Sequence, residues 1–461
     1  MSKIYKNKDR KKYWIKENKI IFRPEFNEPL DKYHHIIKNY THLIFSNLIN
    51  VNKCISWNNI KISDDYGRSI SEFNQFVQLN ELMNITHLMF GSKFNKNFEP
   101  TESLKYLVFG DKFNKPIELK KSLEHLEFGE AFENPIKLNK SLKYLKFGDY
   151  FNQPIKLNNL LEYVEFGFYF NQPIKLNFNL IHIKFCYHFN NILDLNHKLI
   201  NLELGFCFNQ PIKIPESLEH LELGVKYNQP IEISKSLKSL KICVGDFNQQ
   251  INLLNIKYLE LNSELVSRVK RDDLFPYIYT MDYFIKHSKR KSKYESKSDN
   301  NKKLKRKIKK YANSVDIDQV NNNFQNLIDN LPESLEILKL HDDLYLSLNN
   351  LPNNLKQIIY ISDEYYRKIN NFAKLNCLPE TLEILHLPYK YNEQIKKIPK
   401  NLKTIHCNKN YIYQNVFVEN NIEINYYTDD DDDDDDYDYD YDDDDDYDDY
   451  DDYDDEDEMK L

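Results

Sequence analysis

Large apolar residues recur along the chain with a constant period of about 19 residues, which is short for a repeat protein. A second large apolar residue, most often Phe, follows each of them two places later, and most copies have an aliphatic residue three places earlier. The unit therefore reads L-x-x-L-x-F, and its last part alternates with period two, which is typical of a half-buried strand. The ten central positions are Leu88, Leu107, Leu126, Leu145, Val164, Ile183, Leu202, Leu221, Leu240 and Leu259.

A second pattern begins four residues after the Phe of each unit. It reads FNQPI at 151–155, 170–174 and 208–212, with close variants at 113–117 and 227–231. Proline has no amide donor, so it is excluded from a central strand and suits an extended return path behind the strand. The repeat is too short to hold a strand together with a full crossover helix. We therefore predict a solenoid of stacked rungs, each with one short parallel strand, two corners and a return segment.

The return segment predicts two further ladders. Its phenylalanines, including Phe151, Phe170 and Phe208, are expected to stack as an internal column behind the strands. Its asparagines recur in nearly every copy, and we interpret them as side chains that satisfy backbone groups at a tight corner rather than as a ligand-binding row. Glu133 replaces this asparagine in one rung and has Asn134 next to it, which indicates a local slip of the register.

The FNQPI and LEHLEFG units resemble FNIP repeats, a family related to leucine-rich repeats and known from social amoebae and giant DNA viruses. The resemblance covers 26–261, and a looser leucine-rich version returns at 331–407. It implies a mainly β, leucine-rich-repeat-like solenoid. Many members of the family carry an N-terminal F-box that couples them to a ubiquitin ligase. The segment before Phe26 is too short and too basic for an F-box, so we do not carry that role over.

Composition divides the chain into segments of different character. The net charge of −9 hides an acidic tail, since residues 429–461 hold 22 Asp, 2 Glu and one Lys and carry −23, which leaves +14 for the rest. We expect a basic N-terminal segment at 1–25, a solenoid at 26–262 that is regular over 86–262, a basic, partly helical or disordered insertion at 263–323, a second leucine-rich-repeat-like block at 324–427, and a disordered Asp/Tyr-rich tail at 428–461.

Residues 286–311 contain 13 Lys or Arg against two acidic residues and carry +11. Such a block is typical of a solvated linker, and it also resembles a nuclear localisation or nucleic-acid-binding patch. A third interpretation is that it pairs with the acidic tail of the same chain, because both segments are expected to be flexible and are opposite in charge. A tail of this charge favours basic partners and repels nucleic acid.

The outward-facing positions of the strands form the candidate contact surface. One column is rich in aromatic residues, which are common both at interfaces and as packing partners in sheets. Its flanking columns hold Glu and Lys that mostly alternate from rung to rung, and this alternation is expected to fix the register. Glu203 and Glu222 break it and are candidates for contact with a basic partner. The candidate partner face is Tyr106, His125, Tyr144, Tyr163, His182, Glu203, His220 and Glu222.

Sequence motifs of common enzymes do not occur. Phosphate loops, zinc-protease and hydrolase nucleophile motifs are missing, and the six cysteines are scattered, so we expect no catalytic, cofactor or metal site. The N-terminus is charged and no long apolar run occurs. We expect an intracellular monomer, cytoplasmic or nuclear, without membrane contact. Its predicted function is that of a non-enzymatic protein-interaction scaffold. The alternatives are a nuclear or nucleic-acid-associated factor whose basic block is masked by the tail, and a ubiquitin-ligase substrate-recognition subunit with a diverged adaptor segment.

Overall fold

The structure is a computed structural model. It describes residues 12–47, 71–79, 82–243, 247–262, 317–341, 344, 346–361 and 375–427. The basic block at 286–311 and the acidic tail therefore lie outside the described residues, and the expectations about both stay predictions.

One sheet holds all eighteen strands of the described residues. β1 pairs with β2 in antiparallel fashion, and from β2 to β18 every pairing is parallel. The strands are β1 (Tyr13–Lys16), β2 (Lys19–Phe22), β3 (His42–Phe45), β4 (His87–Met89), β5 (Tyr106–Val108), β6 (His125–Glu127), β7 (Tyr144–Lys146), β8 (Tyr163–Phe166), β9 (His182–Phe185), β10 (Asn201–Glu203), β11 (His220–Leu223), β12 (Ser239–Cys243), β13 (Tyr258–Asn262), β14 (Ile337–His341), β15 (Gln357–Ile361), β16 (Ile384–His386), β17 (Thr404–Cys407) and β18 (Glu423–Tyr426).

The predicted register is confirmed along the regular part of the solenoid. β4 to β13 are ten consecutive parallel strands, and the central apolar residue of each lies opposite that of the next, from Leu88 against Leu107 to Leu240 against Leu259. The central residues are almost fully buried, whereas their neighbours in the strand are mostly half-buried. The period-two pattern of the sequence therefore corresponds to strands with one face in the core.

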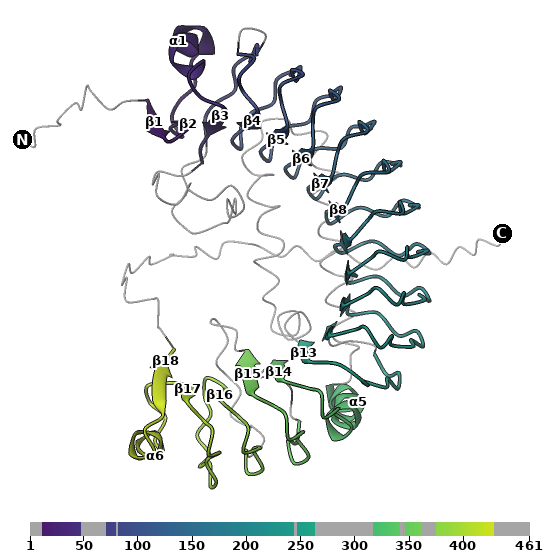
Figure 1. Ribbon diagram of the computed structural model, residues 1–461, viewed down its shortest axis with the longest axis vertical. Coiled ribbons are helices and arrows are strands. Elements are labelled where there is room, and N and C mark those ends of the chain that lie inside the picture. Colours follow the sequence, from purple (N-terminus) through teal and green to yellow (C-terminus); the bar gives the residue numbers. More distant parts are fainter. Residues whose placement is uncertain are drawn as a thin grey trace, which may run out of the picture.

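The solenoid bends into an open arc, with the strands on its inner side and the return segments outside (Figure 1). The curvature is visible in the ring spacings between the rungs of β7 and β8. The centroids of Tyr144 and Tyr163 on the inner face are 4.2 Å apart, and those of Phe147 and Phe166 in the core are 5.7 Å apart. On the return segment, Phe151 and Phe170 are separated by 6.1 Å. Rungs that are closer at their strands than at their backs stack into an arc with a concave strand face.

Two phenylalanine columns fill the core of the regular rungs. Phe151, Phe170 and Phe208 belong to the return-segment column and are 0–1% exposed, which confirms the predicted internal stack. The second column comes from the strands and includes Phe147. Within one rung the two columns touch, as Phe147 and Phe151 do at a centroid distance of 3.7 Å. Buried aromatic stacks of this kind supply much of the apolar area that holds successive rungs together.

The N-terminal end of the sheet is a hairpin. The sequence assigned 1–25 to a basic segment ahead of the solenoid, but Tyr13–Lys16 and Lys19–Phe22 form β1 and β2. Ile20, Ile21 and Phe22 are fully buried, which makes β2 the first rung of the core. The nine Lys and Arg of residues 1–25 concealed this short apolar run in the composition. A 3₁₀ turn (Leu30–Tyr33) and a one-turn helix α1 (His34–Ile37) lead from it to β3.

The two repeat blocks share one sheet. β13 pairs in parallel with β14, with Leu259 opposite Leu338, so the chain resumes the stack after residues 263–316. Helix α5 (Ile317–Asp329) precedes β14 and buries Phe324 and Ile328. The short helix α6 (Asn415–Glu419) contacts β18 at the C-terminal end of the sheet.

The asparagine ladder is confirmed as a structural device. The Asn190 amide donates to Oδ1 of Asn171 (3.0 Å), and the Asn209 amide donates to Oδ1 of Asn190 (2.8 Å). The predicted slip at Glu133 is wrong, because its amide donates to Oδ1 of Asn114 (3.2 Å) as an asparagine amide would. Phe132 also keeps its place in the aromatic column. The longer side chain accepts a hydrogen bond from Nδ2 of Asn114 (3.1 Å), and its backbone keeps its place in the ladder.

Candidate functional site

A continuous stack of aromatic rings runs along the concave face of the solenoid. Neighbouring ring centroids are 4.0–5.1 Å apart and their planes are close to parallel. Every member opens its strand and is half-buried. We call this row the ring stack; its seven members are His42, His87, Tyr106, His125, Tyr144, Tyr163 and His182.

The ring stack brings together five of the eight residues that the sequence proposed as a partner face, Tyr106, His125, Tyr144, Tyr163 and His182. His220 lies in the same column but beyond the end of the stack, because Asn201 stands between it and His182. His220 is exposed, and the rings of the stack are not. The stack also extends back to His87 in the first regular rung and to His42 in the irregularly spaced part before it, and the sequence analysis included neither in the partner face.

Carboxylates two residues further along the strands fix several ring tips. Nε2 of His125 lies 2.6 Å from a carboxylate oxygen of Glu127, and the Tyr163 hydroxyl donates to Glu165 (3.0 Å). The pair is repeated in β13, where the Tyr258 hydroxyl donates to a carboxylate oxygen. A ring held by stacking on its faces and by a hydrogen bond at its tip has little rotational freedom. The column is therefore a rigid surface that presents ring edges to the solvent.

A ladder of ion pairs runs beside the ring stack. It includes Lys146 and Glu165, which are 3.1 Å apart. Glu203 and Glu222 lie opposite each other in β10 and β11, as the sequence indicated. Each of them nevertheless has a lysine on its other side, Lys184 at 2.8 Å and Lys241 at 3.2 Å. The break in the alternation is therefore neutralised from both flanks, which weakens the case for a basic partner at this point.

Burial perturbs the titration of the ring stack. It is the main reason why the pKa of His87 is lowered to about 4, and the neighbouring His42 and His125 act in the same direction. Burial likewise lowers the pKa of His182. The Thr86 hydroxyl lies 2.8 Å from Nδ1 of His87 and can donate to the neutral ring. At neutral pH His87 and His182 are therefore uncharged, and their rings offer hydrogen-bonding groups rather than positive charge.

The two ends of the concave face differ from its centre. At the N-terminal end, the places that carry Glu or Lys elsewhere hold Ile21, Ile44, Met89 and Val108, which form a small cluster and are 0–7% exposed. Towards the C-terminal end, His386 and His406 stack at a centroid distance of 3.7 Å. The sequence analysis missed both features. The apolar cluster was readable from the missing charges, but the changing repeat length of the second block concealed the histidine pair.

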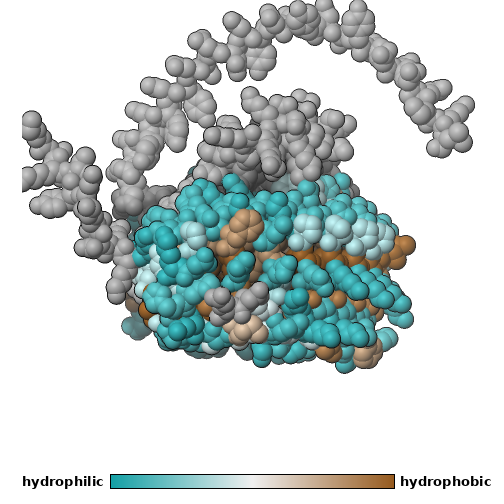
Figure 2. All heavy atoms as spheres, turned by 90° about the horizontal axis from the view of Figure 1, so that it is seen from above, coloured by the Kyte–Doolittle hydropathy of each residue, from teal (hydrophilic) through white to brown (hydrophobic). Residues whose placement is uncertain are grey.

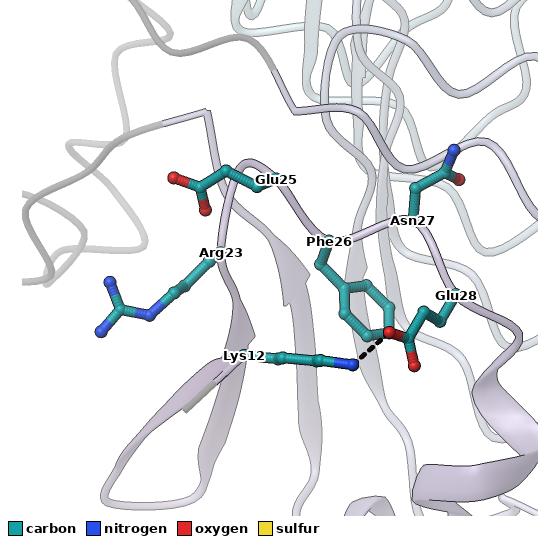
Figure 3. Close-up of a pocket in the computed structure, with 6 residues that line it drawn as sticks. All are labelled: Lys12, Arg23, Glu25, Phe26, Asn27 and Glu28. Carbon is teal, nitrogen blue, oxygen red and sulfur yellow. Dashed lines mark hydrogen bonds and ion pairs between the residues drawn. The ribbon is translucent and has the colours of Figure 1, made fainter. Parts of the chain in front are cut away.

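A shallow pocket lies at the N-terminal corner, away from the ring stack. Lys12 and Glu28 form an ion pair across it, and the ring of Phe26 lies beside them (Figure 3). Arg23 on its rim is placed over the ring of Trp14 at 4.2 Å. Lys12, Glu28 and Arg23 thus have partners within the chain. They hold the first corner against the hairpin and do not converge on an empty centre.

Within the described residues, no group of three or more side chains is arranged to hold a metal ion. The described helices are also too short or too polar to cross a membrane. Seen from above, the surface is largely hydrophilic, with an apolar band between hydrophilic rows (Figure 2). Such rows arise because equivalent residues of successive rungs lie side by side.

Comparison with known proteins supports this architecture. The model of the FNIP Repeat family matches residues 101–131, 132–169 and 208–234. No curated protein matches the chain.

Among solved structures, the chain is similar to CroV588, which is described as a novel circular LRR protein. The two are 26% identical in sequence and superpose with a TM-score of 0.52. The match covers 87% of this chain and 58% of that chain, so the present chain spans less than two thirds of the length of CroV588. The chain therefore carries FNIP repeats on a leucine-rich-repeat-like solenoid.

Proposed function

We propose that the chain is a non-enzymatic scaffold and that it holds a protein partner on the concave strand face, with the ring stack as the centre of contact. Repeat solenoids typically serve as protein-interaction scaffolds, because their curvature creates an extended concave surface. FNIP and leucine-rich repeats are generally non-enzymatic. The observation that carries the proposal is the continuity of the stack from His42 to His182.

The physical argument is one of preorganisation. Ordering a side chain on binding costs free energy, and rings already held by stacking and by carboxylates, such as Tyr163 with Glu165, have little freedom left to lose. Tyrosine edges offer both apolar area and a hydroxyl, which is why tyrosine is enriched among residues that dominate interfaces. The flanking ion ladder is internally neutral, so we propose that the partner is selected by shape and hydrogen bonding rather than by net charge.

Site-specific photo-crosslinking in extract from the native cell tests the proposal. Benzoylphenylalanine replaces Tyr144 in the stack or the exposed His220 beside it, and the matched control carries it at Phe178, which is 62% exposed and lies off the concave face. We expect the same partner to be captured from Tyr144 and His220 and not from Phe178. Capture from Phe178 alone would place the interaction elsewhere.

The two alternatives from the sequence stay predictions. The nuclear or nucleic-acid role depends on the basic block at 286–311, which lies outside the described residues. Deleting that block should abolish binding to nucleic acid if this alternative holds. Co-purification of a ubiquitin-ligase adaptor with the chain would support the other.

A further inference from the structure

The lysines of the regular rungs fall into two classes. On the concave side many are paired with a glutamate of the adjacent rung, as Lys143 is with Glu124 at 2.9 Å. On the convex side the residue five places after the Phe or Tyr of each return segment forms a column. Its members are Glu118, Lys137, Lys156, Lys175, Asp194, Lys213 and Glu232.

Three lysines of this column stand on successive rungs. Lys137, Lys156 and Lys175 are all exposed, and none of them makes an ion pair within the described residues. Like charges on neighbouring rungs repel each other, and the concave face avoids this by alternating Lys with Glu. The convex face keeps three positive charges in a row instead. We call these three residues the basic strip, and its uncompensated charge is suited to an anionic partner.

The spacing of the strip suits an extended acidic polypeptide. The phenylalanines five residues earlier on the same return segments, Phe132, Phe151 and Phe170, are 6.1 Å apart. An extended chain rises about 3.3 Å per residue, so side chains on one of its faces recur roughly every 6.6 Å. Asp429–Asp436 is an uninterrupted run of eight aspartates. Every second carboxylate of such a run can therefore meet one lysine of the strip.

We propose that the basic strip docks the acidic tail of the chain, residues 428–461. The tail has 34 residues after Tyr427 and spans up to about 110 Å when extended. The strip at the rung of β8 is ten pairings away from β18, which is about 60 Å along the arc at 6 Å per rung. The tail is thus long enough to reach the strip. Tethering also gives it a high effective concentration there.

The contact is made of many weak interactions. Exposed ion pairs contribute little individually, and they are screened within a Debye length of about 8 Å at physiological ionic strength. We therefore expect docking to be loose and to weaken as salt rises. Three lysines cannot neutralise a segment of −23, so most of the tail stays available for a basic partner while its first part is docked.

Zero-length carbodiimide cross-linking of the full chain, followed by mass spectrometry of the monomer, tests the proposal at low salt. The strip variant Lys137→Glu/Lys156→Glu/Lys175→Glu is compared with a control of equal charge change, Lys235→Glu/Lys390→Glu/Lys396→Glu, at exposed positions outside the strip. We expect bonds between strip lysines and tail carboxylates in the unmodified chain and in the control. In the strip variant, tail cross-links to this region of the convex face should fall at least tenfold, and melting curves should stay unchanged.

Three results would overturn the proposal. Tail carboxylates joined only to lysines of 286–311 would make that block the docking site of the tail. Cross-links formed only between two copies would exclude docking within one chain. The third result combines two observations. No tail cross-links form, and the unmodified chain binds a fluorescent single-stranded oligonucleotide. If the strip variant loses this binding and the control keeps it, nucleic acid is the occupant of the strip.

Discussion

Glu260 of β13 and Lys339 of β14 form an ion pair across the junction of the two repeat blocks, at a distance of 3.5 Å. The same carboxylate lies 3.6 Å from Lys241 of β12 and accepts a hydrogen bond from Tyr258. Glu260 is only 6% exposed. Burial by itself would raise the pKa of this carboxyl, but the hydrogen bond from Tyr258 and the two lysines outweigh it, so that its pKa is lowered. The junction is thus closed by a buried charge with partners on both sides.

Replacing Glu260 by Ala is expected to lower the free energy of unfolding by about 2–3 kcal/mol, because two partly buried lysines lose their counter-charge. Glu336→Ala is the matched control, since Glu336 bridges Lys257 (3.0 Å) and Lys356 (2.8 Å) at the exposed edge of the same junction. Exposed pairs contribute little, so this variant should unfold almost like the parent. The stability that Glu260 contributes is present above its pKa in the unfolded chain, about 4.3, and is lost as the pH falls through its lowered pKa in the folded state. Equal losses in both variants, measured by denaturant titration, would contradict the assigned role of Glu260.

Leu145→Asp should destabilise the solenoid by at least several kcal/mol. Leu145 is fully buried in the middle of the stack, between Leu126 and Val164, so the new carboxylate would have no partner. Leu160→Asp introduces the same charge one rung away at a position that is 49% exposed, and it should have a small effect. Thermal unfolding followed by circular dichroism compares the two. An unchanged transition in Leu145→Asp would mean that the strand column is not the core.

Acidification is expected to destabilise the concave face. Because burial lowers the pKa of His87 to about 4, the folded state binds this proton less readily than the unfolded chain, whose histidines titrate near 6.5. The stability contributed by the neutral ring is fully present above about pH 6.5 and is lost as the pH falls towards 4. His87 stacks on His42 at 4.0 Å and on Tyr106 at 4.2 Å. The positive charges of Lys19 and Lys105 also lower the pKa of His87, because they repel a charged ring.

His87→Phe retains the stacked ring and removes the titration. Between pH 7 and pH 5 we expect this variant to lose about 1–2 kcal/mol less stability than the parent. His197→Phe, at an exposed position off the stack, should follow the parent curve. Urea unfolding at a series of pH values measures the difference. Parallel curves for all three proteins would show that His87 is readily protonated in the folded state.

The rungs were predictable from the sequence because each position repeats its physical role. Leu145 has the same neighbours as Leu126 one rung earlier, so the pattern is averaged over many copies. The concave face was predictable only as a row of outward-facing residues. The period of the repeat does not encode rotamers or distances between side chains. It therefore could not predict that His125 lies within hydrogen-bond distance of Glu127, or that Lys184 neutralises Glu203. The first hairpin was missed because β1 has no repeat to compare it with.

Glu133 offers a gain of stability rather than a loss. In most rungs the asparagine Oδ1 accepts the amide of the next rung, as Asn152 does from Asn171 (3.0 Å). At Glu133 the longer side chain extends to the preceding rung, where Nδ2 of Asn114 donates to its Oε1 (3.1 Å). Glu133→Asn should give this rung the asparagine geometry of the other rungs, in which Oδ1 accepts the amide of the next rung, and raise the free energy of unfolding by about 0.5–1 kcal/mol, the usual net value of a hydrogen bond. Glu133→Gln separates this effect from the loss of charge, since it is neutral but keeps the long side chain. Denaturant titration should rank Asn above both Gln and Glu, and an equal gain in the Gln variant would show that removing the charge, and not the hydrogen bond, is what stabilises the rung.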